Sequence, residues 1–155
     1  MNGIYRTIAG RIRAESQDLA RVVERTDRIW QQALTSGDDY YVDATALNLH
    51  GFYAGLERLL EIIADGVDQA KPGGAHWHDE LLRQMAAEIP GVRPPVLSQE
   101  TRERLDRYRG FRRVVRNAYN LDPEQIGVLV KQLAPTMARV AQELTAFADF
   151  LEQVA

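Results

Sequence analysis

The sequence predicts an all-α fold, in the form of an antiparallel up-and-down four-helix bundle. Apolar residues recur every third or fourth position over long stretches, which is the period of amphipathic helices. No segment alternates with period two for long enough to predict a strand. Four predicted helices of about 23 to 34 residues are joined by short links, as in up-and-down bundles. A fifth, short helix is predicted in the connection between the second and third long helices. Counted along the chain, this short helix is the third, and the fourth is the arginine-rich helix described below, called the basic helix.

The length of 155 residues corresponds to about one globular domain, so a single domain is expected over residues 1–155. The chain has no cysteine, which excludes disulfides, a cysteine nucleophile and cysteine-ligated metals. Three arginines, Arg6, Arg11 and Arg13, interrupt the apolar residues near the N-terminus before a signal peptide could form. No stretch approaches the roughly 20 apolar residues of a membrane span. We therefore expect a cytoplasmic protein that does not interact with membranes.

The first two long helices are predicted over residues 3–36 and 39–69. Gly37 stands where a C′ glycine ends a helix. The aspartates at 38–39 offer an N-cap to the next helix. The Lys-Pro-Gly-Gly run at 71–74 breaks the second helix.

A short helix is predicted over 76–89, followed by an irregular connector that contains the prolines of 90–95. The fourth helix should begin after Ser98, a favourable N-cap residue, and continue to about Asn120. The run Asp-Pro-Glu-Gln at 122–125 combines an N-cap, a proline at N1 and a glutamine at N3. It therefore predicts the start of the last helix.

The fourth helix carries an unusual density of arginine. Arginine makes up 17 of the 19 basic residues, and seven of these arginines fall within 102–116. At about 100° per residue, the spacing 3, 4, 3 places four side chains on one stripe: Arg109, Arg112, Arg116 and Tyr119. Arg113 and Asn117 flank this stripe, and apolar residues occupy the other side of the helix.

The sequence offers this basic face few local acidic partners. Like charges three or four positions apart repel one another, and Asp106 is the one acid at those offsets. An unpaired cluster of arginines favours an outside anion such as phosphate, or an acidic partner surface. The alternatives are a solvated face, or ion pairs with acids on neighbouring helices, for which Glu61, Asp65 and Asp68 are candidates.

The segment FRRVVRNAY at 111–119, followed by LDP at 121–123, resembles the signature region of the HepT-like branch of the HEPN superfamily. Members of that branch are small helical bundles encoded beside a minimal nucleotidyltransferase. Their motif is Arg, four residues, His, one residue and Tyr. Other parts of the chain are also similar to a HepT-like subgroup: residues 47–53, 56–58, 77–78, 89–94 and 147–151.

The resemblance implies a toxin that cuts RNA without a metal, with two motif helices meeting across a homodimer interface. It also implies a cognate minimal nucleotidyltransferase that neutralises the toxin by transferring AMP to the motif tyrosine. The motif arginine corresponds to Arg112 and the motif tyrosine to Tyr119. Arg109, Arg113 and Arg116 are the candidate RNA phosphate contacts.

This sequence has Asn117 where the family motif has histidine. Metal-free RNA cleavage needs a group that moves a proton near neutral pH, which histidine does and asparagine cannot. Asn117 can still orient a ribose or phosphate by hydrogen bonds. His50 and His78 are candidate substitutes, although His50 lies near the apolar seam and is also typical of a core histidine. His76 and His78 diverge by about 200° around a helix, so no metal site is predicted, and no cofactor either.

The sequence is compatible with three readings, two of which assign a function. The first is the HepT-like component of a two-gene toxin–antitoxin module, which binds RNA and acts as a metal-independent endoribonuclease. The second is a non-enzymatic binding or regulatory subunit of a nucleotidyltransferase, which the asparagine at 117 favours. A third reading is a structural helical protein without a ligand.

Overall fold

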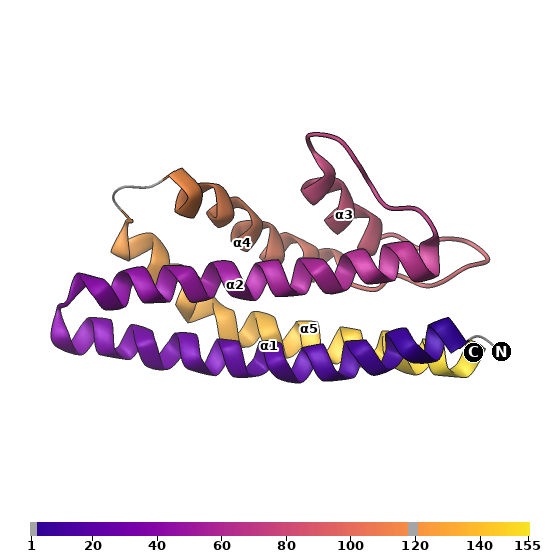
Figure 1. Ribbon diagram of the computed structural model, residues 1–155, viewed down its shortest axis with the longest axis horizontal. Coiled ribbons are helices and arrows are strands. Elements are labelled where there is room, and N and C mark those ends of the chain that lie inside the picture. The colour runs from indigo at the N-terminus through magenta and orange to yellow at the C-terminus, as the bar shows by residue number, and fades with distance from the viewer. Residues whose placement is uncertain (1–2, 118–120) are drawn as a thin grey trace.

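The computed structural model describes residues 3–117 and 121–155, and the side chains of residues 116 and 117 are outside that description. It confirms the all-α prediction, since the described residues contain helices and no strand. In chain order the helices are α1 (Gly3–Ser36), α2 (Asp39–Ile63), the π-helical turn η1 (Ala64–Asp68), α3 (Trp77–Met85), α4 (Gln99–Asn117) and α5 (Pro123–Val154) (Figure 1).

The four long helices run up and down, reversing direction at each connection (Figure 1). α1 packs along both α2 and α5, and these three helices form an elongated layer. α4 crosses this layer obliquely and contacts α2 and α5. The short α3 stands beside α4 and contacts both α4 and α2. The basic helix is therefore flanked by α2 on one side and by the short extra helix on another.

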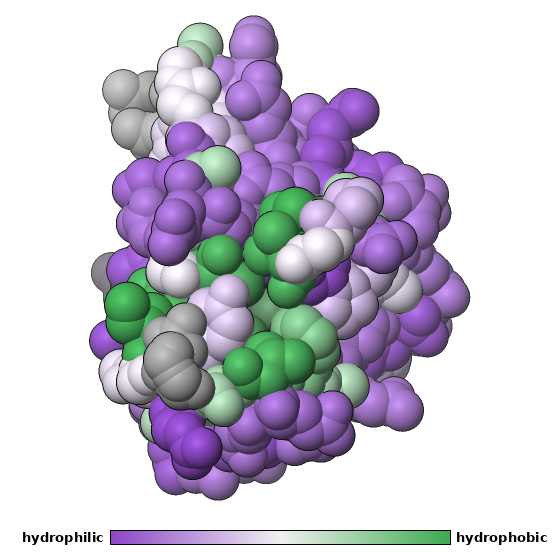
Figure 2. Space-filling model, turned by 90° about the vertical axis from the view of Figure 1, so that its right-hand side faces the viewer, coloured by the Kyte–Doolittle hydropathy of each residue, from purple (hydrophilic) through white to green (hydrophobic). Residues whose placement is uncertain are grey.

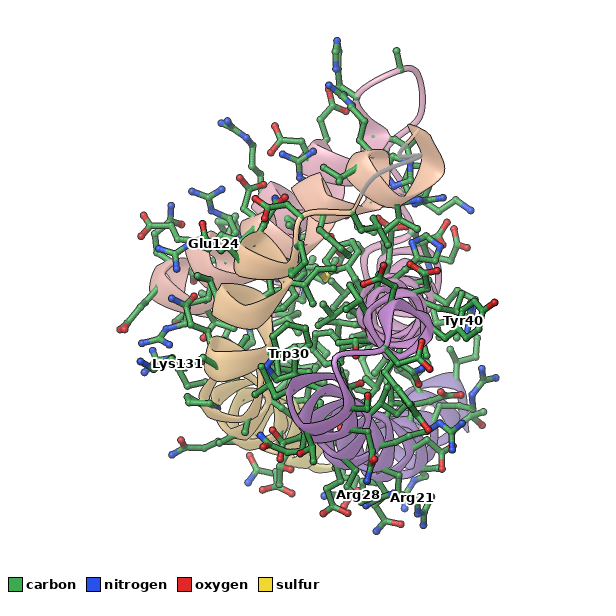
Figure 3. All side chains as sticks on the ribbon, turned by 90° about the vertical axis from the view of Figure 1, so that its left-hand side faces the viewer. Arg21, Arg28, Trp30, Tyr40, Glu124 and Lys131 are labelled. Atoms are coloured by element: carbon green, nitrogen blue, oxygen red, sulfur yellow. The ribbon has the colours of Figure 1, made fainter. Side chains whose placement is uncertain are left out.

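The interior is built from the apolar stripes that the sequence predicts on each helix. Phe52 and Tyr108 pack edge to face across α2 and α4, with ring centroids 5.7 Å apart. At the other end of the layer, Trp30 of α1 points toward α5 (Figure 3). A Cβ on Gly127 would lie 3.0 Å from Cζ2 of Trp30, so this glycine allows the close approach of α5 to the indole.

The predicted helix boundaries at 36–39 and 122 are confirmed together with their caps. Gly37 has φ +68°, and its N–H donates to the carbonyl of Ala33 at 3.1 Å. The Asp38 carboxylate accepts from the Tyr40 N–H at 2.9 Å. The Asp122 carboxylate accepts from the Glu124 N–H at 3.0 Å.

The short third helix ends earlier than predicted, at Met85 rather than 89. The connector competes for its last carbonyl groups: the N–H groups of Val96 and Leu97 both donate to Met85 O, at 2.9 and 3.1 Å. Ile89 instead pairs with Arg93 in an isolated β-bridge. The second helix reaches the predicted end, but its last turn is π-helical and stops at Gln69, whose φ is +54°.

A buried ion pair fixes the connector to the end of the second helix. Arg93 donates from Nε and Nη2 to the two carboxylate oxygens of Asp68, at 2.5 and 2.8 Å. Both side chains are fully buried. The remaining donor, Nη1, serves the carbonyls of Ala87 and Pro94, at 2.8 and 3.0 Å. Because Arg93 Nη2 also donates to Gln84 O, this ion pair sets the position of α3 relative to η1.

We expect Ser98→Ala to lower the free energy of unfolding by about 1 kcal/mol, within the range of 0.5–2 kcal/mol typical of a lost N-cap. Ser98 Oγ accepts from the N–H of Thr101 at 3.1 Å, and the Ser98 N–H donates to Glu143 at 2.6 Å. Urea unfolding measures the change. Thr35→Ala is the control, because that hydroxyl is exposed near the end of α1 and donates to Gln31 O within its own helix; an equal loss in both variants would contradict the capping role.

The end of the molecule that carries the two termini presents apolar side chains bordered by hydrophilic ones (Figure 2). Ile4 and Val154, near the chain ends, are 58% and 49% exposed. No helix among the described residues is long and apolar enough to cross a bilayer.

Candidate functional site

An acidic side chain lies inside the bundle beneath the basic helix. Glu57 of α2 is only 4% exposed. It follows Tyr53 by one helical turn, so both residues lie on the side of α2 that faces away from solvent. A carboxylate in such a place is strongly disfavoured unless cations and hydrogen-bond donors surround it.

Two side chains from other helices contact the carboxylate oxygens of Glu57. Arg112 of α4 donates from Nη1 to Glu57 Oε1 at 2.9 Å. His78 of α3 places Nδ1 2.7 Å from Glu57 Oε2. The same histidine nitrogen lies 3.1 Å from Arg112 Nη1, so the three side chains form one compact cluster. We call Glu57, His78 and Arg112 the Glu–His–Arg cluster.

The outer members of the cluster remain accessible to a ligand. The side chains of His78 and Arg112 are 26% and 29% exposed. The neighbouring Trp77 covers one side of the imidazole, with ring centroids 3.6 Å apart and planes inclined by 32°. The imidazole is therefore held by contacts on its ring as well as on its nitrogen.

Arg109 lies one turn before Arg112 and has two acidic neighbours. Its Nε donates to Asp106 at 2.7 Å, and its Nη2 is 4.0 Å from Asp79 of α3. Burial by itself would lower the pKa of Arg109, but the hydrogen bond to Asp106 and the charges of both aspartates outweigh it. The pKa is thus raised above its ordinary value, and the guanidinium stays charged although it is partly buried.

Of the alternatives that the sequence left open for this basic face, ion pairs with acids on neighbouring helices hold for Arg109 and Arg112, and Asp106 is the local partner expected for Arg109. The acids expected on those helices are, however, not the ones used here: Glu61 and Asp65 lie near Lys71, at 3.6 and 3.7 Å, and Asp68 binds Arg93. The partners that the structure brings to the face are Glu57 and Asp79. Their distance from α4 in the sequence explains the error, because only the packing of α2 and α3 against α4 joins them.

Two buried polar atoms near the cluster make no hydrogen bond among the described residues: Arg112 Nε and Tyr53 Oη. Burial raises the pKa of Tyr53, and the charge of Glu57 raises it further. The Tyr53 phenol is therefore neutral and is not a proton acceptor near neutral pH.

The structure thus brings two of the predicted site residues together, Arg112 and His78. His50 is half-buried on α2, seven residues before Glu57 and so on the same stripe of that helix. Arg113 is exposed on α4. The side chains of Arg116 and Asn117, and the whole of Tyr119, lie outside the described residues.

Glu57 is the functional candidate that the sequence reasoning did not single out. A signal for it exists in the sequence. Glu57 directly follows Leu56 and lies one turn after Tyr53, and these two apolar residues belong to the pattern that recurs every third or fourth position along the predicted second helix. A lone carboxylate at the edge of an apolar stripe requires a buried cationic partner, and the arginine-rich helix offers one.

This arrangement suits chemistry on a phosphate ester. A guanidinium stabilises negative charge on phosphorus, and an imidazole oriented by a carboxylate moves protons near neutral pH. Both groups lie on a face that arginine dominates, which attracts polyanions. The fold and these contacts define a small helical bundle with a basic, partly exposed side-chain cluster between α2, α3 and α4.

One of the comparisons with known proteins finds a match. The model of the HepT-like protein family matches residues 44–151, which is most of the chain and includes all three helices of the site. The protein therefore belongs to the HepT-like family, and this membership implies a HEPN-type toxin of toxin–antitoxin systems. No curated protein and no solved structure matches the chain.

Proposed function

We propose that this protein is the RNA-cleaving component of a two-gene toxin–antitoxin module, and that it needs no metal. RNA would bind along the basic face, through Arg109, Arg112, Arg113 and Arg116. The observation that carries the proposal is the contact of Arg112, the motif arginine, with His78, a histidine from another helix. The site thus contains a proton carrier even though Asn117 replaces the motif histidine.

The reaction proposed is the attack of a ribose 2′-oxygen on the adjacent phosphorus. His78 accepts the 2′-hydroxyl proton, the 2′-oxygen–phosphorus bond forms, and the bond from phosphorus to the 5′-oxygen breaks. The departing 5′-oxygen takes a proton from water. The products are a 2′,3′-cyclic phosphate and a 5′-hydroxyl, and Arg112 stabilises the charge that develops on the phosphoryl oxygens.

The proposed partners are RNA, a second copy of this chain and a cognate minimal nucleotidyltransferase. The nucleotidyltransferase would neutralise the protein at Tyr119. In that step the tyrosine oxygen bonds to the α-phosphorus of ATP, pyrophosphate leaves and the phenolic proton is lost. Tyr119 follows Arg112 by seven residues in the sequence, so the added phosphate would bring negative charge close to the basic face and weaken RNA binding.

Cleavage of single-stranded RNA by the purified protein in EDTA tests the nuclease proposal. We expect cleavage to persist in EDTA, to leave 2′,3′-cyclic phosphate ends, and to fall by about 10²–10³-fold in Arg112→Ala. Intact RNA with the wild-type protein, or cleavage that stops when EDTA is added, would contradict the proposal.

Incubation with ATP and the proposed cognate nucleotidyltransferase tests the modification proposal. We expect the peptide that contains Tyr119 to gain the mass of one AMP group, and we expect cleavage of RNA to fall in proportion. Tyr119→Phe is the control, because it removes the acceptor oxygen alone. A mass gain that persists in Tyr119→Phe would place the modification elsewhere.

A second candidate function, a non-enzymatic regulatory subunit of a nucleotidyltransferase, is favoured by Asn117. In that case the basic face would present a substrate or bind the partner, and Arg112 would serve binding alone. The distinguishing result is tight association with the nucleotidyltransferase by a wild-type protein that leaves RNA intact in both EDTA and Mg²⁺.

A further inference from the structure

We propose that Glu57 is a positioning residue that holds His78 in the Nδ1–H tautomer, so that Nε2 is the free proton acceptor. The inference deepens the proposed function and rests on it where it concerns catalysis. Its structural part, the tautomer of His78, can be measured without any substrate. Glu57 touches neither substrate nor reacting atoms, and it acts through the imidazole.

The argument begins with the proton between His78 and Glu57. Nδ1 and Oε2 are 2.7 Å apart, a distance at which two unshared electron pairs repel one another. A carboxylate only accepts, so the proton belongs to Nδ1. The neutral imidazole has one N–H, and its lone pair is then on Nε2.

Arg112 could compete for the same nitrogen, because its Nη1 lies 3.1 Å from His78 Nδ1. That guanidinium nitrogen carries two hydrogens, and Glu57 Oε1 accepts one of them at 2.9 Å. The imidazole-to-carboxylate contact is the shorter of the two, and it joins a donor to a full negative charge. Glu57 therefore accepts one charge-assisted bond on each oxygen, from Arg112 on one side and from His78 on the other.

The burial of Glu57 favours the Nδ1–H tautomer of His78 over the Nε2–H tautomer. The carboxylate is nearly inaccessible to water, so loss of the Nδ1–H bond would leave a buried acceptor oxygen unsatisfied. Among the residues whose side chains are described, the charged groups near the cluster include Arg109 and its two acidic neighbours, Asp79 and Asp106. Among the described residues, the hydrogen-bond contacts of His78 involve Nδ1 and leave Nε2 for a ligand.

The tautomer decides which imidazole nitrogen can accept the proton in the reaction. A base must present its lone pair to the 2′-hydroxyl, and Nε2 is the nitrogen that is not held by Glu57. The paired carboxylate also stabilises the imidazolium that forms after proton transfer, as in other carboxylate–histidine pairs. The same carboxylate holds Arg112 beside the imidazole, so Glu57 aligns the proton acceptor with the phosphate-binding group.

Nitrogen-15 NMR of histidine-labelled protein at about pH 8 tests the tautomer, because a protonated ring nitrogen and an unprotonated one resonate far apart. The His78 signals are assigned by their loss in His78→Ala. We expect the wild-type protein to show Nδ1–H and an unprotonated Nε2. In Glu57→Leu we expect a shift toward the Nε2–H form that is common in free histidine.

Glu61→Leu is the matched control, since Glu61 lies one turn further along α2 and contacts Lys71 rather than the cluster. It should leave the His78 spectrum unchanged. Glu57→Gln is the conservative variant: its amide oxygen still accepts from Nδ1–H, so we expect it to keep more of the Nδ1–H form than Glu57→Leu does.

The kinetic arm measures kcat and KM for RNA cleavage in the same variants. We expect Glu57→Leu to lower kcat about 10²-fold with a smaller change in KM, because proton transfer is affected more than RNA binding. Glu57→Gln should recover part of kcat, and Glu61→Leu should retain all of it. Circular dichroism verifies that each variant remains folded.

The outcomes separate the two proposals. An Nε2–H tautomer in the wild-type protein, or an unchanged tautomer in Glu57→Leu, would overturn the positioning role whether or not RNA is cleaved. An Nδ1–H tautomer that depends on Glu57, in a protein that leaves RNA intact, would support the positioning role and overturn the proposed nuclease. The wild-type spectrum decides the tautomer even if Glu57→Leu fails to fold.

Discussion

Arg93→Ala should lower the free energy of unfolding by about 3–5 kcal/mol, the largest stability effect we expect from a single substitution in this chain. The guanidinium and the Asp68 carboxylate are both fully buried, and two hydrogen bonds join them. Removal of Arg93 leaves a negative charge in the interior without its cation. It also removes the donors to the carbonyls of Gln84, Ala87 and Pro94.

Guanidinium unfolding of the wild-type and variant proteins measures this effect. Arg83→Ala is the matched control, because Arg83 is exposed and pairs with Asp79 one turn away on the same helix. Pairs of that kind contribute about 0.3–0.5 kcal/mol. The double variant Arg93→Met with Asp68→Leu should recover much of the loss, since no buried charge remains unpaired. Equal stability of the Arg93 and Arg83 variants would refute the role assigned to the buried pair.

Arg112→Ala should reduce RNA cleavage by about 10²–10³-fold, the range typical when one group that stabilises transition-state charge is removed. Arg112 is both the proposed phosphate-binding group and a hydrogen-bond partner of Glu57, so its loss also loosens His78. Arg112→Lys retains the charge but lacks the planar guanidinium, which can bind a carboxylate and a phosphate at the same time. We therefore expect it to recover only part of the cleavage activity.

Arg107→Ala is the matched control on the same helix. Arg107 is exposed, lies about 140° around α4 from Arg112, and donates to Gln132 of α5 at 2.5 Å. It should leave cleavage nearly unchanged. For single-stranded RNA, loss of the phosphate contact at Arg112 should also lessen the slope of log K against log salt by about 0.7. Equal losses in the two variants would mean that net charge, and not position on the helix, governs activity.

Local signals in the sequence predicted the helices well because local physics sets their ends. Gly37, Asp38 and Asp122 each stand at a position where only a few residue types satisfy the free backbone groups. The third helix was predicted four residues too long for the opposite reason. Its end depends on Val96 and Leu97, which bond to Met85 from a connector more than ten residues away.

The basic face also combines features that follow from the local sequence with contacts that depend on the packing of the helices. By itself, the sequence determined that Arg109 and Arg112 share a stripe of one helix, because the period of the α-helix follows from the backbone alone. Family membership implies a HEPN-type toxin, and phosphate binding by that stripe is our proposal. Neither of these could show which acids neutralise it, since Glu57 and Asp79 lie on separate helices.

Only the tertiary structure decided that Glu57, His78 and Arg112 meet. They are separated by 21 and 34 residues along the chain, and no periodic pattern relates positions on three different helices. The packing of α3 and α4 against α2 brings them within hydrogen-bond distance, and the buried pair of Arg93 and Asp68 holds α3 in place. The sequence thus determined the helices and the basic stripe, whereas the packing of the helices decided which histidine lies beside the motif arginine.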